Sequence, residues 1–219
     1  MQSESIDIWE KIVSNPPVPY KEYFSSEFRF LSSYLQSNFK VLDIGSGDGR
    51  TIESIAPLVS SVIGIDNDLK SVELSRQKLQ RVPNTSVYFM DAEQMDFPDE
   101  SFDAVFSGLT FVNFGQTKQK ILAEIRRVLK KQAPFIFSVY GEHAQPMREQ
   151  AYRRHGSYSV IDDKGTVKFD DTNIISEQFS QQEITNILMD ARFKVKQIEE
   201  GSIYYLIASV KDEKRLPIS

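Results

Sequence analysis

The run FKVLDIGSGDGR at 39–50 constrains the fold more than any other stretch of the chain. Its first half is apolar apart from one acid, Asp43, which indicates a buried strand over 39–44. Glycine then occupies positions 45, 47 and 49, where a backbone without Cβ atoms can turn sharply and let a ligand approach. Residues 50–57 are typical of a helix, whose free N–H groups attract polar or anionic ligands. The run therefore predicts a strand, a ligand-binding turn and a helix.

The spacing of the glycines discriminates between ligands. A dinucleotide site has the pattern G-x-G-x-x-G, whereas this chain has G-x-G-x-G with Arg50 in the place of the third glycine. Asp43, two residues before the first glycine, adds a carboxylate that suits a cationic ammonium group and repels a pyrophosphate. A strand–turn–helix unit that binds nothing and an NAD site remain alternatives at this point.

Two further acids stand at the ends of predicted strands. The apolar run 62–65 ends in Asp66, which lies about 20 residues beyond the turn, where an acid can accept hydrogen bonds from both hydroxyls of a ribose. The next apolar run, 87–90, ends in Asp91. The run FDAVFS at 102–107 is apolar enough for a central strand, and a fifth strand is predicted at 135–140.

Together, DIGSGDG at 43–49, the acid at 66, Asp91 with Ala92 and the 102–107 strand resemble the class I S-adenosylmethionine (SAM) methyltransferases in order and spacing. The resemblance implies an α/β, Rossmann-like fold: a seven-stranded sheet in the order 3-2-1-4-5-7-6, with strand 7 antiparallel and helices on both faces. It also implies SAM as the cofactor and S-adenosylhomocysteine as the product. The cofactor-binding residues implied by the resemblance are Asp43, Gly45, Ser46, Gly47, Asp66, Asn67, Asp91, Ala92, Glu93 and Ser107.

The chain is expected to form one domain, because 219 residues with 40% hydrophobic and 26% charged side chains are enough for one sizeable core. An insertion after the fifth strand would lie over the sheet edge where open α/β folds bind ligands. Within the single domain 1–219, we expect a helical cap at 1–38, the SAM-binding core at 39–140, an insertion or lid at 141–179, and a final helix with an antiparallel strand pair at 180–210. The prolines at 16, 17 and 19 should break any helix, and a second helix is expected at about 21–37. A loop or short hairpin is expected around 162–165, and Ser180 with Glu183 three residues later predicts a capping box at the start of the final helix.

No motif identifies the acceptor side of the pocket. The residues expected to wall it are Tyr20, Tyr23, Phe111, Asn113 and Tyr140. A general base is needed only if the acceptor must lose a proton. His143 is the first candidate for that catalytic role, because histidine titrates near neutral pH and position 143 directly follows a predicted strand. The other candidates are His155, Tyr140 and Glu142.

The composition disfavours several functions and locations. A net charge of -5 makes nucleic acid a disfavoured partner. The absence of cysteine excludes disulfides and cysteine-ligated metals, and no metal site is expected at the scattered acids. The first residues lack the pattern of a signal peptide, and no apolar run approaches the roughly 20 residues of a membrane-spanning helix. We therefore expect a cytoplasmic protein without a membrane partner.

The function expected from these features is that of an enzyme, a SAM-dependent methyltransferase that moves a methyl group to N or O of a small-molecule acceptor. Three alternatives stay open: a protein methyltransferase, an RNA methyltransferase, and a SAM-binding protein without catalytic activity. The identity of the acceptor, the methylated atom, the use of a general base and the oligomeric state are left open by the sequence.

Overall fold

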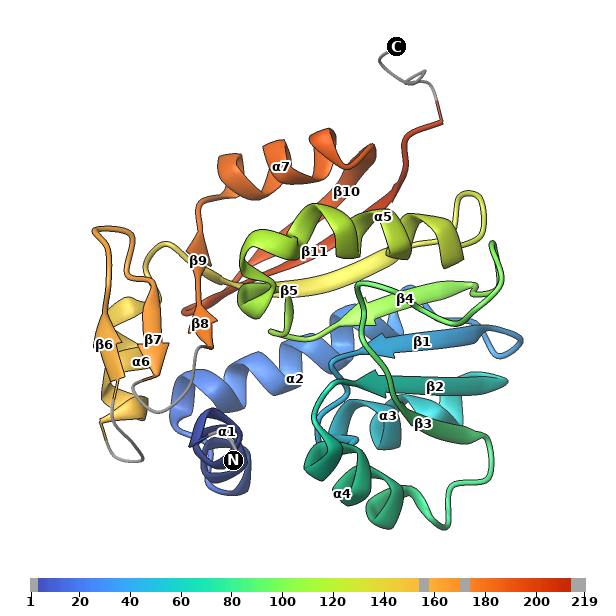
Figure 1. The fold of residues 1–219 in the computed structure, drawn as a ribbon, viewed down its shortest axis with the longest axis horizontal. Helices are drawn as coiled ribbons and strands as arrows, with labels where there is room; N and C mark the ends of the chain where they lie inside the picture. The colour runs from blue at the N-terminus through green and yellow to red at the C-terminus, as the bar shows by residue number, and fades with distance from the viewer. Residues whose placement is uncertain (1–3, 154–157, 170–173, 214–219) are drawn as a thin grey trace.

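A computed structural model describes residues 4–153, 158–169 and 174–213 of the chain. Its centre is a mixed β-sheet with helices on both faces (Figure 1). The main strands, in chain order, are β1 (Lys40–Ile44), β2 (Ser61–Asp66), β3 (Thr85–Phe89), β4 (Ala104–Ser107), β5 (Phe135–Gly141), β10 (Phe193–Glu200) and β11 (Tyr204–Lys211).

The strands lie in the order β10-β11-β5-β4-β1-β2-β3. Strands β1 to β5 are parallel to one another, whereas β11 is antiparallel to both β5 and β10. Because β10 and β11 are the sixth and seventh strands of the predicted fold, the expected order 3-2-1-4-5-7-6 is confirmed. A short strand, β9 (Gln178–Phe179), adds a parallel pair at the end of β5.

The burial of the strands follows their place in the sheet. Every residue of β4 and β5 is buried, as expected for parallel strands that are covered on both faces. The edge strand β10 instead exposes Lys194 and Lys196. Lysine side chains on an edge hinder its pairing with a second sheet.

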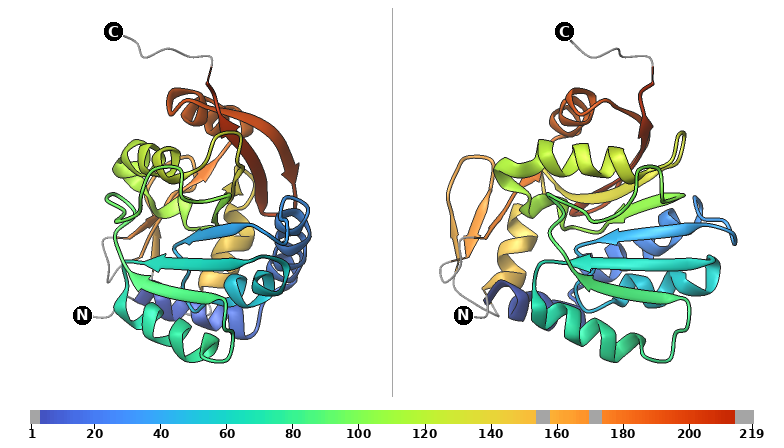
Figure 2. Two further views of the ribbon diagram at one scale, coloured as in Figure 1. Left: turned by 90° about the vertical axis from the view of Figure 1, so that its right-hand side faces the viewer. Right: turned by 45° about the vertical axis from the view of Figure 1, so that its right-hand side comes forward.

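The helices flanking the sheet leave a crevice between β1 and β4. Helices α3 (Arg50–Ile55) and α4 (Leu69–Leu79) follow β1 and β2, and α5 (Lys118–Val128) follows β4. The chain moves outward in opposite directions from β1 and from β4, so right-handed crossovers place α5 on the other face from α3 (Figure 2). Ligands of open α/β folds bind at such a reversal of strand order, beyond the carboxyl ends of the strands. Within the described ranges, no helix has the length and apolar composition needed to span a bilayer.

Two helices precede the sheet, α1 (Glu4–Ser14) and α2 (Val18–Ser32). We expected the prolines at 16, 17 and 19 to break any helix and the second helix to cover 21–37. That expectation is only partly right, because α2 begins at Val18 and contains Pro19 in its first turn. A proline is tolerated there, since the first-turn N–H groups have no partner within the helix.

The insertion forms a small structure of its own. It consists of α6 (Gln145–Tyr152) and an antiparallel sheet of β6 (Tyr158–Val160), β7 (Val167–Phe169) and β8 (Ile175–Ser176). Of the loop or short hairpin expected around 162–165, the structure shows the hairpin, which connects β6 and β7. These elements lie beyond the ends toward which the arrows of β1 and β2 point (Figure 1).

The predicted capping box is present at the start of α7 (Gln181–Asp190), which packs along β10. The Ser180 hydroxyl accepts a hydrogen bond from the backbone N–H of Glu183 at 3.2 Å. The Glu183 carboxylate accepts one from the backbone N–H of Ser180 at 2.9 Å. Two N–H groups that the helix itself does not pair are satisfied in this way.

We expect Ser180→Ala to lower the free energy of unfolding by about 1 kcal/mol, because the N–H of Glu183 loses its acceptor. Urea unfolding followed by circular dichroism measures the change. The control is Ser180→Thr, which keeps a hydroxyl group and should remain within about 0.5 kcal/mol of the unsubstituted protein. Equal losses in the two variants would contradict the assigned cap.

Candidate active site

A cavity of about 1020 Å³ opens at the carboxyl ends of β1, β2, β4 and β5. Its volume is at the upper end of the range of ligand pockets, about 300–1,000 Å³. The walls come from the glycine turn after β1, the tips of β2 and β3, the loop after β4, α1 and the insertion. The acidic side chains Asp43, Asp66 and Asp91 mark one part of it, and the aromatic side chains Trp9, Phe114, Tyr140, Tyr152 and Phe169 mark another.

The glycine turn brings its backbone against the cavity. Gly45 and Gly47 have φ angles of +71° and +53°, in the left-handed region that favours glycine. A Cβ on Gly45 would come within 2.2 Å of the Thr110 side chain, whereas a Cβ on Gly47 would meet no protein atom within 4 Å. The N–H of Gly45 donates to the Ile65 carbonyl oxygen at 2.8 Å, which fixes the turn to β2. The space above Gly47 is therefore open to a ligand.

Asp66, the last residue of β2, is held by two backbone donors. The N–H of Gly47 donates to its Oδ2 and the N–H of Asp68 to its Oδ1, both at 2.9 Å. Burial raises the pKa of Asp66, and these backbone hydrogen bonds oppose the rise. Each carboxylate oxygen keeps a further lone pair. The oriented carboxylate can therefore accept hydrogen bonds from a diol such as that of ribose.

Three residues after β3 continue the wall beyond Asp66: Asp91, Ala92 and Glu93. The N–H of Met90 donates to the Asp66 carbonyl oxygen at 3.0 Å, so the tips of β2 and β3 are adjacent. One carboxylate oxygen of Asp91 accepts the N–H of Glu93 at 2.8 Å. The Asp91 side chain is exposed, and its second oxygen is free to accept from a ligand amine.

Asp43 places a carboxyl group in the cavity wall although only 2% of the residue is exposed. Burial, and next the negative charge of Glu27, raise the pKa of Asp43 to about 8, while Arg50 opposes the rise. In the ligand-free protein Asp43 is therefore mostly protonated at neutral pH. A cation bound beside it would favour the ionised form.

A buried ion pair stands next to Asp43. The Arg50 guanidinium donates to Glu27, which is 1% exposed and also accepts a hydrogen bond from the Tyr23 hydroxyl. The guanidinium carbon lies 4.3 Å from the centre of the Phe24 ring. Arg50 is thus held at the cavity wall, and its remaining N–H groups can bind a carboxylate.

The aromatic part of the cavity contains three linked phenols. The Tyr140 hydroxyl lies 3.2 Å from that of Tyr20 and 3.3 Å from that of Tyr152. Tyr140 and Tyr152 line the cavity, and Tyr20 stands behind them. The ring centres of Trp9 and Tyr20 are 6.3 Å apart in an edge-to-face contact. Helix α1 therefore contributes to the same wall as the end of β5.

Most of the predicted site residues line this cavity, and their binding roles remain predictions. The residues in question are Asp43, Gly45, Ser46, Gly47, Asp66, Asn67, Asp91, Ala92, Glu93, Asn113 and Tyr140.

Four of the predicted binding residues do not line the cavity. Ser107 is fully buried at the end of β4, and Phe111 packs in the core with its ring centre 4.8 Å from that of Phe137. The Tyr23 hydroxyl bonds to Glu27 and Ser138, and Tyr20 is linked to the pocket through Tyr140. The roles expected of these four residues remain predictions, and the packing of their side chains does not favour them.

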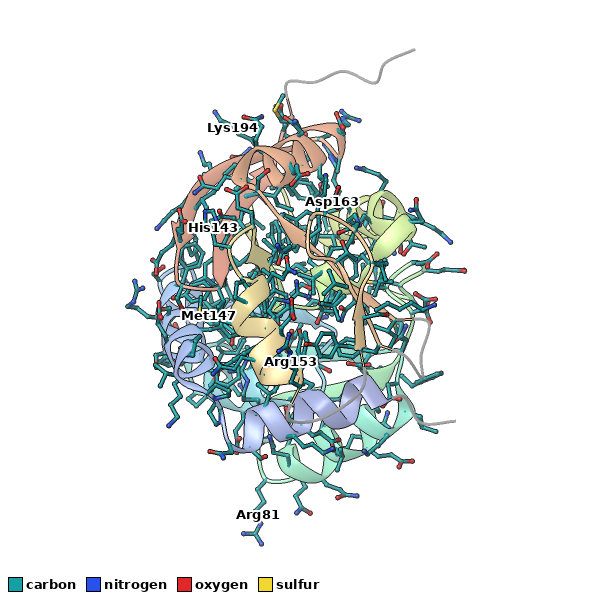
Figure 3. All side chains as sticks on the ribbon, turned by 90° about the vertical axis from the view of Figure 1, so that its left-hand side faces the viewer. Arg81, His143, Met147, Arg153, Asp163 and Lys194 are labelled. Carbon is teal, nitrogen blue, oxygen red and sulfur yellow. The ribbon has the colours of Figure 1, made fainter. Side chains whose placement is uncertain are left out.

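His143 does not lie near the pocket. The chain turns outward after β5, so that the His143 side chain is 78% exposed and approaches only Glu142, at 3.9 Å. Figure 3 shows it on the outside of the molecule near the start of α6. His143 therefore does not line the cavity, and its expected role as a general base remains a prediction that this exposed position does not favour; Glu142 is half exposed beside it. The other histidine, His155, lies outside the described residues.

Sequence reasoning missed Arg50, Glu27 and Thr110 as parts of this site. Arg50 offered a signal, because it replaces the third glycine of the dinucleotide pattern at the start of a helix. Glu27 stands among aromatic residues of α2 with no pattern that announces a buried charge. No sequence pattern points to Thr110, which is recognised as part of the site only from its packing against Gly45.

Comparison with known proteins finds similarity to methyltransferases over part of the chain. Residues 42–137 match the family described as "Methyltransferase domain". The uncharacterized methyltransferase YcgJ of Bacillus subtilis is 28% identical over 137 residues, which cover 57% of this chain and 54% of the relative. The demethylmenaquinone methyltransferase of Thermotoga maritima is 32% identical over 100 residues, which cover 44% of this chain and 42% of the relative. The chain thus spans about half the length, or less, of these curated relatives.

Among solved structures, a SAM-dependent methyltransferase from Aquifex aeolicus is similar in fold. The TM-score is 0.66 at 20% identity, and the match covers 96% of this chain and 100% of that one. This likeness concerns the fold alone. Taken with the sequence match at 42–137 and the strand order of the sheet, it makes the chain similar to the SAM-dependent methyltransferases, in sequence over 42–137 and in fold over most of its length.

Proposed function

We propose that this chain binds SAM and transfers its methyl group to N or O of a small-molecule acceptor, releasing S-adenosylhomocysteine. The observation that carries the proposal is one continuous cavity whose wall is acidic next to the glycine turn and aromatic next to the insertion. A nucleoside with a cationic tail fits the first part in its chemistry, and an apolar acceptor fits the second.

The residues of the acidic part fit the functional groups of SAM. Asp66 would accept the ribose hydroxyls, and Asp91 with Ala92 would face the adenine. The turn at Gly45 and Gly47, with Asp43 beside it, would hold the amino-acid end. Glu93 and Asn67 complete the wall around the adenine.

Arg50 is the partner that we assign to the carboxylate of the cofactor. Its side chain is already oriented by Glu27 and by the face of Phe24. Little conformational entropy would be lost when Arg50 binds, because packing fixes the guanidinium in advance. Asp43 would pair with the ammonium of the same amino-acid end.

Catalysis would come mainly from positioning. Bound SAM supplies a methyl group on a sulfonium, which is an excellent leaving group. The aromatic walls exclude water and hold the acceptor, and such proximity can supply roughly 7–11 kcal/mol. Among the cavity residues, burial raises the pKa of Tyr140 well above its ordinary value, so that this phenol acts as a hydrogen-bond donor rather than as a base.

Two relatives whose names state their acceptors support a small molecule. The Thermotoga maritima relative is a demethylmenaquinone methyltransferase, and a relative from Marinomonas is a malonyl-[acyl-carrier protein] O-methyltransferase. The aromatic part of the cavity accords with an apolar acceptor, and the net charge of -5 disfavours RNA. A protein methyltransferase and a non-catalytic SAM-binding protein are the alternatives that the following test separates.

The test is calorimetric titration with SAM, followed by transfer of label from methyl-labelled SAM into a metabolite extract, a protein extract and total RNA. We expect SAM binding, and label in the metabolite fraction alone. Label in the protein or the RNA fraction would show that the acceptor is a protein or an RNA instead. SAM binding without transfer to any fraction would support the non-catalytic alternative, and the absence of SAM binding would overturn the proposal.

Asp66→Asn should weaken SAM binding by at least about tenfold, because the amide nitrogen cannot accept from the backbone N–H groups or from ribose. The dissociation constant is measured by calorimetry, with circular dichroism as a check on folding. Asp190→Asn, at the exposed end of α7, removes the same charge far from the cavity and serves as the control. Equal affinities in the two variants would argue against a role for Asp66 in binding.

SAM affinity should rise with pH up to about 8. Asp43 has an ordinary pKa of 3.8 and a pKa of about 8 in the ligand-free fold, so the folded protein holds a proton that the unfolded chain lacks over this window. The ligand-free fold is therefore destabilised as pH rises from 3.8 toward 8. Binding of the cationic cofactor favours the ionised carboxylate, so that binding at pH 6–7 releases a proton and affinity rises by up to about tenfold per pH unit.

Calorimetry of SAM binding in two buffers that differ in ionisation enthalpy counts the released protons. The substitution Asp43→Asn should abolish this release and flatten the pH dependence between 6 and 8. Proton release that persists undiminished in Asp43→Asn would assign the titration to another group.

A further inference from the structure

A buried positive charge lies behind the aromatic part of the cavity. Arg148 on α6 is 0% exposed. Its guanidinium donates to neutral oxygens: to Oε1 of Gln178 at 3.1 Å, to the carbonyl of Gly165 at 3.3 Å, and to the carbonyl and hydroxyl of Ser176 at 2.9 and 2.8 Å. Nε has no partner among the described residues, and none of their carboxylates forms an ion pair with Arg148. A buried charge that only neutral groups solvate is costly, and an anion nearby would stabilise it.

Two tyrosines separate this charge from the cavity. The guanidinium carbon of Arg148 lies 4.1 Å from the ring centre of Tyr140 and 5.8 Å from that of Tyr152. Both rings line the cavity. The field of Arg148 therefore reaches the cavity through a low-dielectric wall, where electrostatic effects are stronger than in water.

The three phenols form a chain of hydroxyl groups next to this charge. The Tyr140 hydroxyl bonds to that of Tyr20 and accepts from that of Tyr152, and Tyr152 is also a hydrogen-bond partner of Arg148. Because Tyr140 and Tyr152 line the cavity and a hydroxyl proton can rotate, these phenols can turn a donor toward a ligand. Burial raises the pKa of Tyr20 and of Tyr140 well above the ordinary value, so these hydroxyls stay protonated and donate.

We propose that the Tyr140–Tyr152 hydroxyls, backed by Arg148, recognise an oxyanion on an otherwise apolar, ring-sized acceptor: a carboxylate or an enolate. The inference rests on the proposed function and specifies its substrate class. The rest of this part of the cavity accords with an apolar body, since Trp9, Val112, Phe114 and Phe169 line it. Glu10, which follows Trp9 in the cavity wall, forms an ion pair with Lys70 at 3.3 Å, so that its charge is offset.

The rival role for Arg148 is purely structural. Its hydrogen bonds join α6 to the turn before β7, to β8 and to β9, and could serve only to hold the insertion together. Loss of a structural clamp would alter the binding of charged and neutral ligands alike. If Arg148 instead helps to recognise an oxyanion, its substitution should abolish the preference for the anion over its neutral counterpart.

The test is a set of calorimetric titrations of the full chain saturated with S-adenosylhomocysteine. The carboxylate probe is 2-naphthoate, with the neutral 2-naphthamide and cationic 2-naphthylmethylammonium as matched ligands. The enolate probe is ionised 1,3-cyclohexanedione, with cyclohexanone as its neutral counterpart. We expect one of the anions to bind at least about fivefold more tightly than its counterpart, the order expected when a hydrogen bond gains a full charge. The anion that shows the preference identifies the oxyanion class.

Three substitutions locate the preference. Tyr152→Phe, Tyr140→Phe and Arg148→Met should each reduce it to about twofold or less while the neutral probe keeps its affinity, and Arg148→Lys should restore part of it. Tyr34→Phe is the control, because it removes a phenol that bonds Gln197 on the exposed surface. The tyrosine variants decide the question if Arg148→Met fails to fold.

The inference is overturned if both anions show less than about fivefold preference, if the cation binds as tightly as 2-naphthoate, or if the preference survives in the two tyrosine variants. S-adenosylhomocysteine binding, measured first in the same protein, keeps the two proposals apart. If S-adenosylhomocysteine does not bind, the proposed function is overturned. If it binds but neither anion is preferred, only this inference is overturned.

Discussion

The site depends on the hydrogen bond from the Gly47 N–H to the Asp66 carboxylate, which joins the turn after β1 to the tip of β2 at 2.9 Å. The bond requires Gly47 to adopt a left-handed backbone, and the same conformation leaves the space above it free of protein atoms. One local constraint therefore does two things: it orients a carboxylate and it opens the surface next to it. Thr110, packed on Gly45, extends the effect to the loop after β4.

The parts of the fold that the sequence predicted are those set by local patterns. The glycine turn, the acids at strand ends and the capping box at Ser180 each depend on residues only a few positions apart. The strand order followed from the resemblance, and it is confirmed because alternating strands and helices with right-handed crossovers admit few topologies. The prediction from local sequence was wrong at 18–20, because Pro19 lies inside α2 rather than ending a helix.

The parts that the sequence could not supply depend on contacts between distant segments. Glu27 and Arg50 are 23 positions apart, and Arg148 meets Gln178 across 30. Burial of a charged side chain is visible only when its partners are assembled, so Glu27 and Arg148 could not be distinguished from surface residues. His143 illustrates the converse, because chemical suitability and proximity to a strand say nothing about whether the turn after that strand points inward.

Negative and positive side chains lie at different parts of the cavity wall. Burial, and next the charge of Glu27, raise the pKa of Asp43, and Arg50 forms its ion pair with Glu27 rather than with Asp43. A second positive group, brought by a ligand, is therefore favoured beside Asp43 and disfavoured beside the buried guanidinium of Arg148. An anionic group on the acceptor is disfavoured beside Asp43, because the acidic part repels it, and is favoured beside Arg148. A cationic cofactor and an anionic acceptor would thus each be excluded from the other's place by charge alone, and the two would enter one cavity in a single relative orientation.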